Sequence, residues 1–305
     1  MNAGSQGPRI GSGGVWSNFD RLPADQVVAF AGSAEAAGYH AIWTQETAGR
    51  DPFALLAHLA AHTGRLELGV GIAVTYGRDP VAMRAGASTV HELSGGRMLL
   101  GLGISHRDTV SEVRGHAYRG PLSAMRQYLE AYAAASYRAP TPHGPPPVIL
   151  AALRRRMLAL AATHANGAFP YLVPPSYIPA ARRILDDAAA VAGRPRPILV
   201  VSQACLLETD PDTARAAARR YLDRYLGLPN YLANLRELGF ADDELARPGA
   251  DRVVDALVAW GDEAAVRGRL RAMLDAGADH VAMIPLNPEG LHADRSTMEA
   301  LAPPW

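Results

Sequence analysis

The sequence predicts an α/β fold, a (β/α)8 barrel of the TIM type with a helical insertion after its seventh strand. Eight short apolar segments alternate with helical segments along the chain, which implies parallel strands joined by right-handed crossovers. The 305 residues match the size of one such barrel, and no shift in composition marks a domain boundary. A doubly wound sheet with a second, helical domain is the alternative.

Each predicted strand is a short apolar run that ends at small or polar residues. The eight runs cover residues 14–17, 41–44, 66–74, 98–103, 148–150, 167–169, 198–207 and 280–285. Apolar residues at helical spacing, often with proline in the first turn, predict helices at 24–37, 52–63, 80–93, 122–137, 154–163, 176–192 and 263–274. Residues 211–258 read as helical throughout and exceed the length of one crossover, so we expect an insertion there. Residues 1–8 are expected to be a disordered tail, which leaves 9–305 as a single domain.

The composition narrows the functional classes. The formal net charge is zero, from 30 basic and 30 acidic side chains, so neither nucleic acid nor a membrane is an expected partner. Every basic residue is arginine, which excludes the aldolases, pyridoxal-phosphate enzymes and P-loop NTPases that need a lysine amine. The single cysteine, Cys205, excludes disulfides and thiolate metal sites. No targeting or membrane-spanning segment is recognisable, so we expect a cytoplasmic protein that acts on a small molecule.

The segment 94–106, SGGRMLLGLGISH, carries the strongest functional signal. Its double glycine ends a helix, and the apolar run that follows predicts a buried strand. Gly103, Ser105 and His106 come at the carboxyl end of that strand, where parallel α/β folds bind their ligands. An imidazole there can donate or accept a proton near neutral pH, although a hydrogen-bonded rim histidine is the plainer alternative.

Three other segments carry signals at the same end of the strands. Glu46 follows the second strand and holds either a cofactor or neighbouring backbone, unless it is a solvated loop carboxylate. Gly69 and Gly71 lie inside the third strand, which indicates a bulge or a close ligand. A predicted helix begins with three arginines, Arg154, Arg155 and Arg156. They are either a binding site for a phosphate or a solvated run of charges. His58 and His62 have the spacing of a helical metal pair, but no third ligand is near, so we expect no metal.

With these residues in hand, the chain resembles the luciferase-like monooxygenase superfamily, and within it the actinobacterial branch that uses the deazaflavin coenzyme F420. The similarity runs from Gly14 to Pro285. It is carried by nine segments in order: GVWS, EAAGYHAIWTQE, RLELGVGIAV, RDPVAMRA, SGGRMLLGLGISH, RGHAYRGPLSAMRQYL, ILAALRRRMLALAATHANGAFPYLVPP, LGLPNYLANLRELGF and AGADHV. The resemblance implies a luciferase-like barrel in which a bulge of the third strand, often with a non-prolyl cis peptide, packs behind a flavin or deazaflavin ring.

The resemblance also implies roles for individual residues. His106 and Glu46 would be the catalytic residues, His106 moving a proton at the substrate and Glu46 positioning the ring. The expected cofactor contacts are Gly71, Ile72, Ala73, Val74, Gly103, Ser105, Ala152, Leu153, Arg154, Arg155, Met157, Pro170 and Tyr171. The expected substrate pocket consists of Trp43, Thr47, Tyr76, His116 and Tyr118, with residues 104–121 as a lid.

The chain departs from the family pattern at several of these positions. Thr47 stands where sugar-phosphate-oxidising relatives often carry a catalytic histidine, and His106 aligns with their proton-donating glutamate. Arg154 and Arg155 replace glycine or proline in the phosphate loop, and Asn166-Gly167 replaces the common Asp-Gly pair. These differences argue against a sugar-phosphate dehydrogenase.

We therefore expect an oxidoreductase that transfers a hydride between coenzyme F420 and a small organic substrate. One alternative is an FMN-dependent monooxygenase that uses reduced flavin and oxygen. A second alternative is a non-catalytic flavin-binding homologue. Relatives are commonly homodimers, so a homodimer is expected here too.

Overall fold

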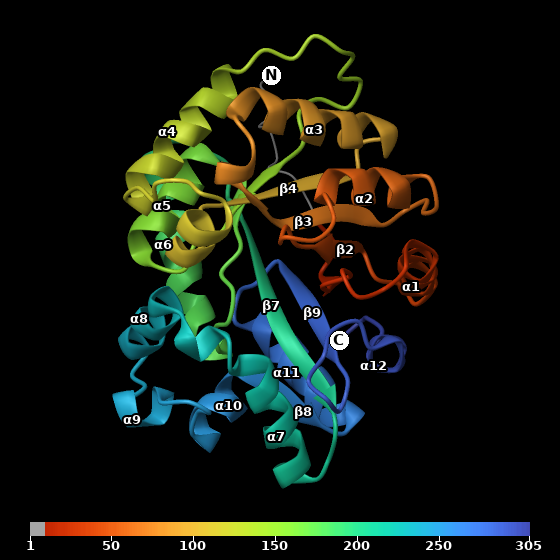
Figure 1. Ribbon diagram of the computed structural model, residues 1–305, viewed down its shortest axis with the longest axis vertical. Helices are drawn as coiled ribbons and strands as arrows, with labels where there is room; N and C mark the ends of the chain where they lie inside the picture. Colours follow the sequence, from red (N-terminus) through yellow and green to blue (C-terminus); the bar gives the residue numbers. More distant parts are fainter. Residues whose placement is uncertain (1–9) are drawn as a thin grey trace. The chain divides into compact units, whose positions relative to one another are not determined.

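A computed structural model describes residues 10–305 of the chain (Figure 1). The tail expected at residues 1–8 lies outside the described residues. The strands are β1 (Gly13–Trp16), β2 (Ala41–Thr44), β3 (Glu67–Val74), β4 (Met98–Gly103), β5 (Val148–Leu150), β6 (Gly167–Ala168), β7 (Ile198–Leu207), β8 (Val258–Gly261) and β9 (His280–Leu286). Their order is β6-β5-β4-β3-β2-β1-β9-β7-β8, and an additional β6–β7 pairing closes the sheet. The predicted (β/α)8 barrel is confirmed, and the doubly wound sheet is excluded.

The strands of the closed ring coincide with the predicted runs, because each is a short apolar segment bounded by glycine or polar residues. Strand β8 was not predicted. It pairs in parallel with Ala204–Leu207 at the far end of β7, outside the ring. Its first residue, Val258, was predicted to end the helical stretch, and its last, Gly261, was predicted to be a turn. A strand this short acquires its conformation from its partner rather than from its own pattern.

Helices connect the strands at the predicted places, and one further short helix, Arg295–Ala300, follows the last strand, where none was predicted. They are α1 (Ala24–Ala36), α2 (Pro52–Ala60), α3 (Pro80–Leu93), α4 (Pro121–Ala134), α5 (Arg155–His164), α6 (Ile178–Val191), α7 (Pro211–Leu222), α8 (Pro229–Glu237), α9 (Asp242–Leu245), α10 (Asp251–Leu257), α11 (Glu263–Asp275) and α12 (Arg295–Ala300). The carboxylates of Asp51, Asp79 and Asp210 cap three of them, each followed by proline. An aspartate cap accepts free amide protons of the first turn, and proline there loses no hydrogen bond.

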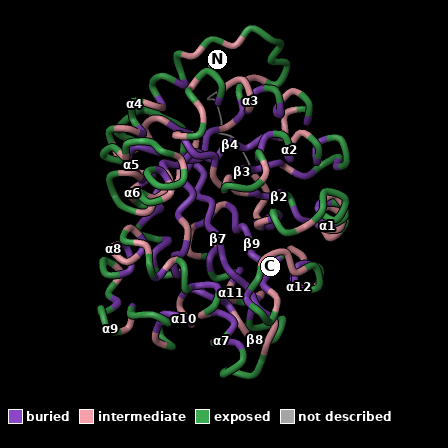
Figure 2. The backbone as a smooth tube through the Cα atoms, viewed as in Figure 1, coloured by how far each residue is buried: buried purple, intermediate pink, exposed green. Residues whose placement is uncertain are grey.

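The chain divides into two compact units. Unit 1 contains residues 43–169 and 181–199, and unit 2 contains residues 11–42, 170–180 and 200–305. In unit 1, α2 packs against α3, α3 against α4, and α4 against α5. The Trp43 side chain fills the space beside β3. A Cβ atom at Gly69 would lie 2.2 Å from the Trp43 indole, so glycine here makes room for a core side chain. Figure 2 shows the strands as the buried part of the chain.

In unit 2, β1 and β7 both pair in parallel with β9. The Tyr39 hydroxyl donates to the carbonyl oxygens of Met298 and Leu301 and so ties the end of α12 to the first helical connection. Helices α7 to α10 occupy the predicted insertion. Among residues 10–305, no helix is long and apolar enough to cross a membrane. That the chain is a single domain stays a prediction.

Candidate active site

Strand β3 bulges at the predicted position. Its parallel register with β4 shifts between Val70 and Ala73, and the Gly71–Ile72 peptide bond is cis, as the resemblance implied. The residues predicted to lie behind a cofactor ring are therefore those at which β3 leaves regular pairing. The neighbouring strand accommodates the bulge because Gly101 has no side chain: a Cβ atom there would lie 2.1 Å from the Val70 carbonyl oxygen.

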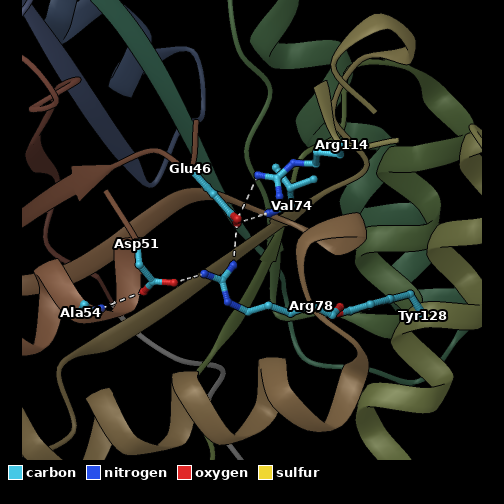
Figure 3. A network of polar contacts seen from close by, with 7 residues as sticks. All are labelled: Glu46, Asp51, Ala54, Val74, Arg78, Arg114 and Tyr128. Carbon is cyan, nitrogen blue, oxygen red and sulfur yellow. Dashed lines mark hydrogen bonds and ion pairs between the residues drawn. The ribbon is translucent and has the colours of Figure 1, made fainter. Parts of the chain in front are cut away.

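Glu46, just after β2, holds both sides of this bulge (Figure 3). Its backbone N–H donates to the Ile72 carbonyl oxygen at 3.2 Å. Its carboxylate Oε2 accepts a hydrogen bond from the Val74 N–H at 2.8 Å. A β-bulge leaves backbone groups without ladder partners, and Glu46 supplies a partner to one group on each side of Ala73.

Two arginines fix the Glu46 carboxylate. Arg78 donates to Oε2 at 2.8 Å, and Arg114 donates to Oε1 at 3.0 Å. The Glu46 side chain is only 7% exposed, so these charge-assisted bonds are partly shielded from water. Gly77 permits this approach, since a Cβ atom there would lie 2.8 Å from both Glu46 Oε1 and Arg114 Nη1. With both oxygens engaged, the geometry favours a positioning role for Glu46 over proton transfer.

Arg78 extends the network to two helices. Its guanidinium also pairs with Asp51, whose carboxylate accepts from the Ala54 N–H at the start of α2. Burial would raise the pKa of Asp51, but the Ala54 amide and the Arg78 guanidinium outweigh it and hold the pKa below its usual value. The Tyr128 hydroxyl of α4 donates to the Arg78 carbonyl oxygen at 2.8 Å. The residues around the bulge are thus anchored to α2 and α4 together.

The tip of β4 has an unusual backbone. Ser105 has a φ of 67°, a left-handed conformation that costs a non-glycine residue energy and is found preferentially at functional sites. The side chain of Ile72 reaches this strand: a Cβ atom at Gly103 would lie 2.0 Å from Ile72 Cδ1. His106 follows, half-buried, and its carbonyl oxygen accepts from the Val110 N–H at 2.9 Å. The bulge and the tip of β4 are therefore packed directly together.

Three of the five residues predicted for the substrate pocket form one aromatic cluster. The Tyr76 ring lies 6.0 Å from the His116 ring and 6.3 Å from the Tyr118 ring, at 31° and 23°. The Arg107 guanidinium lies over the Tyr118 ring, 4.9 Å from the ring centroid. The Tyr76 hydroxyl accepts from the Arg119 N–H at 2.9 Å, which ties the 104–120 connection to the end of β3.

The other two predicted pocket residues are not members of this aromatic cluster. Trp43 has none of its surface exposed and packs edge-on against Phe169 at 5.2 Å, so it is a core residue rather than a wall of the cleft described next. The physical reason is the space that Gly69 leaves beside it. Thr47 lies in the loop after β2, and its hydroxyl oxygen accepts from the Gly49 N–H.

A cleft of about 740 Å³ opens beside the aromatic cluster, within unit 1. It starts where the bulge and β4 end, at Thr75 and Ile104, and continues between the start of α3 and the exposed face of α4. Tyr76 and His116 form part of its wall. The expected lid contains a short π-helical turn, Thr109–Val113, which the sequence did not predict.

The predicted phosphate site lies at the start of α5. Arg154 is the N-cap residue, and its side chain does not cap the helix. Arg154, Arg155 and Arg156 are exposed, Ala152 is buried, and Leu153 and Met157 are half-buried. The first turn of this helix thus carries three consecutive exposed arginines next to its first amides, donor types that suit a phosphate.

Pro170 and Tyr171 belong to unit 2, and their contact with a cofactor stays a prediction. The Tyr171 hydroxyl shares hydrogen bonds with Tyr221 at 2.7 Å and Tyr225 at 2.9 Å. Burial raises the pKa of all three phenols. This buried tyrosine cluster was not predicted, because its members are up to 54 residues apart.

The residues that hold Glu46 were also missed. Neither was singled out from the sequence: Arg78 lies in the segment RDPVAMRA that carries the family resemblance, and Arg114 lies in the expected lid. The His58 and His62 rings do lie close, 4.5 Å apart, but His62 Nδ1 is bonded to the His58 carbonyl oxygen. Within residues 10–305, no group of three or more histidine, cysteine, aspartate or glutamate side chains could hold a metal ion.

Comparison with known proteins agrees with the architecture. A Mycobacterium tuberculosis protein named as a coenzyme F420-dependent oxidoreductase is 28% identical over 256 residues, which cover 73% of each chain. The coenzyme F420-dependent tetrahydromethanopterin reductase of Methanopyrus kandleri has a similar structure, with a TM-score of 0.72 and 19% identity over 97% of this chain and 98% of that one. An F420-dependent secondary alcohol dehydrogenase has a similar structure too, with a TM-score of 0.76 and 11% identity over 96% of this chain and 99% of that one. The family model described as luciferase-like monooxygenase matches residues 4–280. The chain therefore belongs to the luciferase-like monooxygenase family of enzymes.

Proposed function

We propose that this protein is an oxidoreductase that transfers a hydride between coenzyme F420 and a small organic substrate. The names of its relatives support F420 as the cofactor. The M. tuberculosis protein, the M. kandleri reductase and the secondary alcohol dehydrogenase are all described as F420-dependent. The observation that carries the proposal is the bulge of β3, held by Glu46 beside the strained tip of β4. Such a rigid, glycine-rich backbone surface is what a flat ring needs for close approach.

The residues present fit a phosphorylated deazaflavin. Gly71, Ile72, Ala73 and Val74 would lie behind the ring, with Gly103 and Ser105 beside it. The uncapped start of α5, with Arg154 and Arg155, offers amide and guanidinium donors for the phosphate. When bound, the deazaflavin supplies the two-electron hydride chemistry, which no side chain of this protein can provide.

The protein's own residues have separate roles in this proposal. Glu46 keeps the bulge in place through the Val74 N–H. His106 holds or accepts a proton at the substrate atom next to the reacting carbon. Tyr76, His116 and Tyr118 shield that atom from water. The Arg78 and Arg114 guanidiniums keep the Glu46 carboxylate in one orientation.

The role of His106 is tested by His106→Ala. We expect turnover to fall by about 100-fold or more, the range for losing one general acid or base, while the affinity for F420 stays within about twofold. Single-turnover absorbance of the coenzyme and equilibrium titration report the two quantities separately. Loss of binding with unchanged turnover would show that His106 is a cofactor contact instead.

An FMN-dependent monooxygenase remains the second candidate. A Baeyer–Villiger monooxygenase of Pseudomonas putida, solved in complex with FMN, shares the fold with a TM-score of 0.71 at 15% identity. Fluorescence titration of the purified protein with F420 and with FMN separates the two proposals. Saturable quenching of F420 alone supports hydride transfer, whereas binding of FMN with oxygen consumption supports the monooxygenase. Binding of a flavin without turnover of any substrate would favour a non-catalytic homologue.

A further inference from the structure

The cleft beside the aromatic cluster has apolar, aromatic and charged side chains in its lining. Several of its charged and polar side chains already make contacts with the rest of the protein. The Arg78 guanidinium pairs with Glu46 and Asp51. The Asp79 carboxylate accepts from the Val81 and Ala82 N–H groups at the start of α3. The Tyr128 hydroxyl donates to a backbone carbonyl oxygen. Both contacts of Asp79 use Oδ1, so its Oδ2 is the one carboxylate oxygen of the lining without a hydrogen bond among the described residues.

Besides the nearly buried Thr75 hydroxyl, three polar side chains of the lining have hydrogen-bonding groups that make no hydrogen bond with another described residue. They are the guanidinium of Arg119, the carboxamide of Gln127 and the imidazole of His116. Arg119 and Gln127 are exposed, so they lie at the open part of the cleft. The Arg119 guanidinium is a permanent cation and the Gln127 carboxamide can donate. The one acidic residue of the lining, Asp79, caps α3 through Oδ1.

The rest of the wall is apolar or aromatic. Ile104 forms the inner end, Ala124 and Ala131 line the α4 side, and the Tyr76 ring is tilted by 31° from that of His116. A flat or aliphatic body would gain burial here. A positively charged head group at Arg119 would be repelled by the guanidinium, and the one carboxylate of the lining, Asp79, already caps α3 through Oδ1. A neutral polar head group would leave the guanidinium without its best partner.

We propose that this cleft binds an organic acid with an aromatic or apolar body, the carboxylate at Arg119 and Gln127 and the body against Tyr76 and Ile104. Carboxylates are the anions that a guanidinium binds most specifically, through two parallel hydrogen bonds. The inner end of the cleft follows directly on the bulge of β3 and the tip of β4. That the bound acid is the substrate of hydride transfer rests on the function proposed above.

Binding of matched probes to the cofactor-free protein tests this inference. The probes are 2-naphthoate, 2-naphthylmethanol and 2-naphthylmethylamine, which share one ring system and differ in head-group charge. We expect naphthoate to bind about tenfold more tightly than the alcohol, the gain typical of one charge-assisted contact at a partly exposed site, and the amine to bind most weakly. The preference for the acid should shrink as salt rises from 50 to 500 mM.

Variants locate the contact. Arg119→Gln should abolish the preference of naphthoate over the alcohol while the alcohol binds as before. Arg138→Gln, an exposed arginine outside the cleft, should leave the preference intact. Equal binding of acid and alcohol, no binding of either, or a preference that survives Arg119→Gln would overturn the inference.

The same titrations keep this inference separate from the proposed function. F420 binding is measured on its own by fluorescence quenching. If the acid preference is absent while F420 binds, only the cleft inference fails. If naphthoate binds through Arg119 and F420 does not bind, the cleft inference stands and the proposed hydride transfer fails.

Discussion

Replacing Glu46 with alanine removes the acceptor that the structure places between the bulge of β3 and two arginines. The variant loses one backbone hydrogen bond and two ion pairs. Removing one partner of a fully buried pair costs about 3–5 kcal/mol, whereas an exposed pair contributes about 0–1 kcal/mol. The Glu46 side chain is 7% exposed, but those of Arg78 and Arg114 are 16% and 20% exposed, and Arg78 keeps Asp51. We therefore expect a loss of about 2–3 kcal/mol in the free energy of unfolding.

Urea unfolding, followed by circular dichroism, measures this loss. Glu46→Gln should cost less, because its amide oxygen still accepts from the Val74 N–H. Glu130→Ala, an exposed glutamate on α4, is the matched control and should change the free energy by less than about 0.5 kcal/mol. A double-mutant cycle with Arg114→Ala should give a coupling energy of about 1 kcal/mol.

The same variant should weaken F420 binding, because the bulge no longer has a fixed position. We expect the dissociation constant to rise about tenfold in Glu46→Ala, with a smaller rise in Glu46→Gln. A Glu46→Ala protein with unchanged stability and unchanged cofactor affinity would refute the claim that Glu46 organises the site. A loss of stability alone would reduce Glu46 to a structural residue.

Two further predictions concern the barrel itself. Gly69→Ala places a Cβ atom 2.2 Å from the fully buried Trp43 indole. The substitution should lower the free energy of unfolding by about 3 kcal/mol, the upper end for overpacking. A loss below about 0.5 kcal/mol in urea unfolding would show that the indole moves freely. Glu67, at the start of β3, has a buried Oε2 without a hydrogen-bond partner, and burial raises its pKa from 4.5 to about 7. Since the folded pKa exceeds the unfolded one, stability from this group is full below about pH 4.5 and is lost as pH rises to about 7. Glu67→Gln should therefore gain about 1–3 kcal/mol relative to the parent protein between pH 5 and pH 8, and parallel pH dependences of the two proteins would contradict this.

Most of the fold could be predicted from the sequence, because each strand of the ring is a local apolar run between glycine or polar residues. Strand β8 could not, since the helical pattern runs up to Val258 and Val258–Gly261 becomes a strand only through pairing with β7. The bulge was predictable from Gly69 and Gly71, but the two glycines act differently. Gly69 makes room for Trp43, while Gly71 begins the cis peptide.

The site was predictable only where its residues follow strand ends. Tyr76 and His116 were expected in one pocket, and they do form one cluster with Tyr118. The pairing of Glu46 with Arg114 joins residues 68 apart in the chain, and nothing local in either segment specifies the other. Long-range charge pairs of this kind depend on how the loops at the strand ends pack, which a single sequence does not encode in any short pattern.

The central claim is that the bulge of β3 and the tip of β4 form the seat of a deazaflavin. Equilibrium fluorescence titration of the parent protein with F420, beside a parallel titration with FMN, tests it most directly. The account predicts saturable quenching of F420 at micromolar protein, weakened about tenfold by Glu46→Ala, and no saturable binding of FMN. Tight binding of FMN with none of F420, or no binding of either, would contradict it.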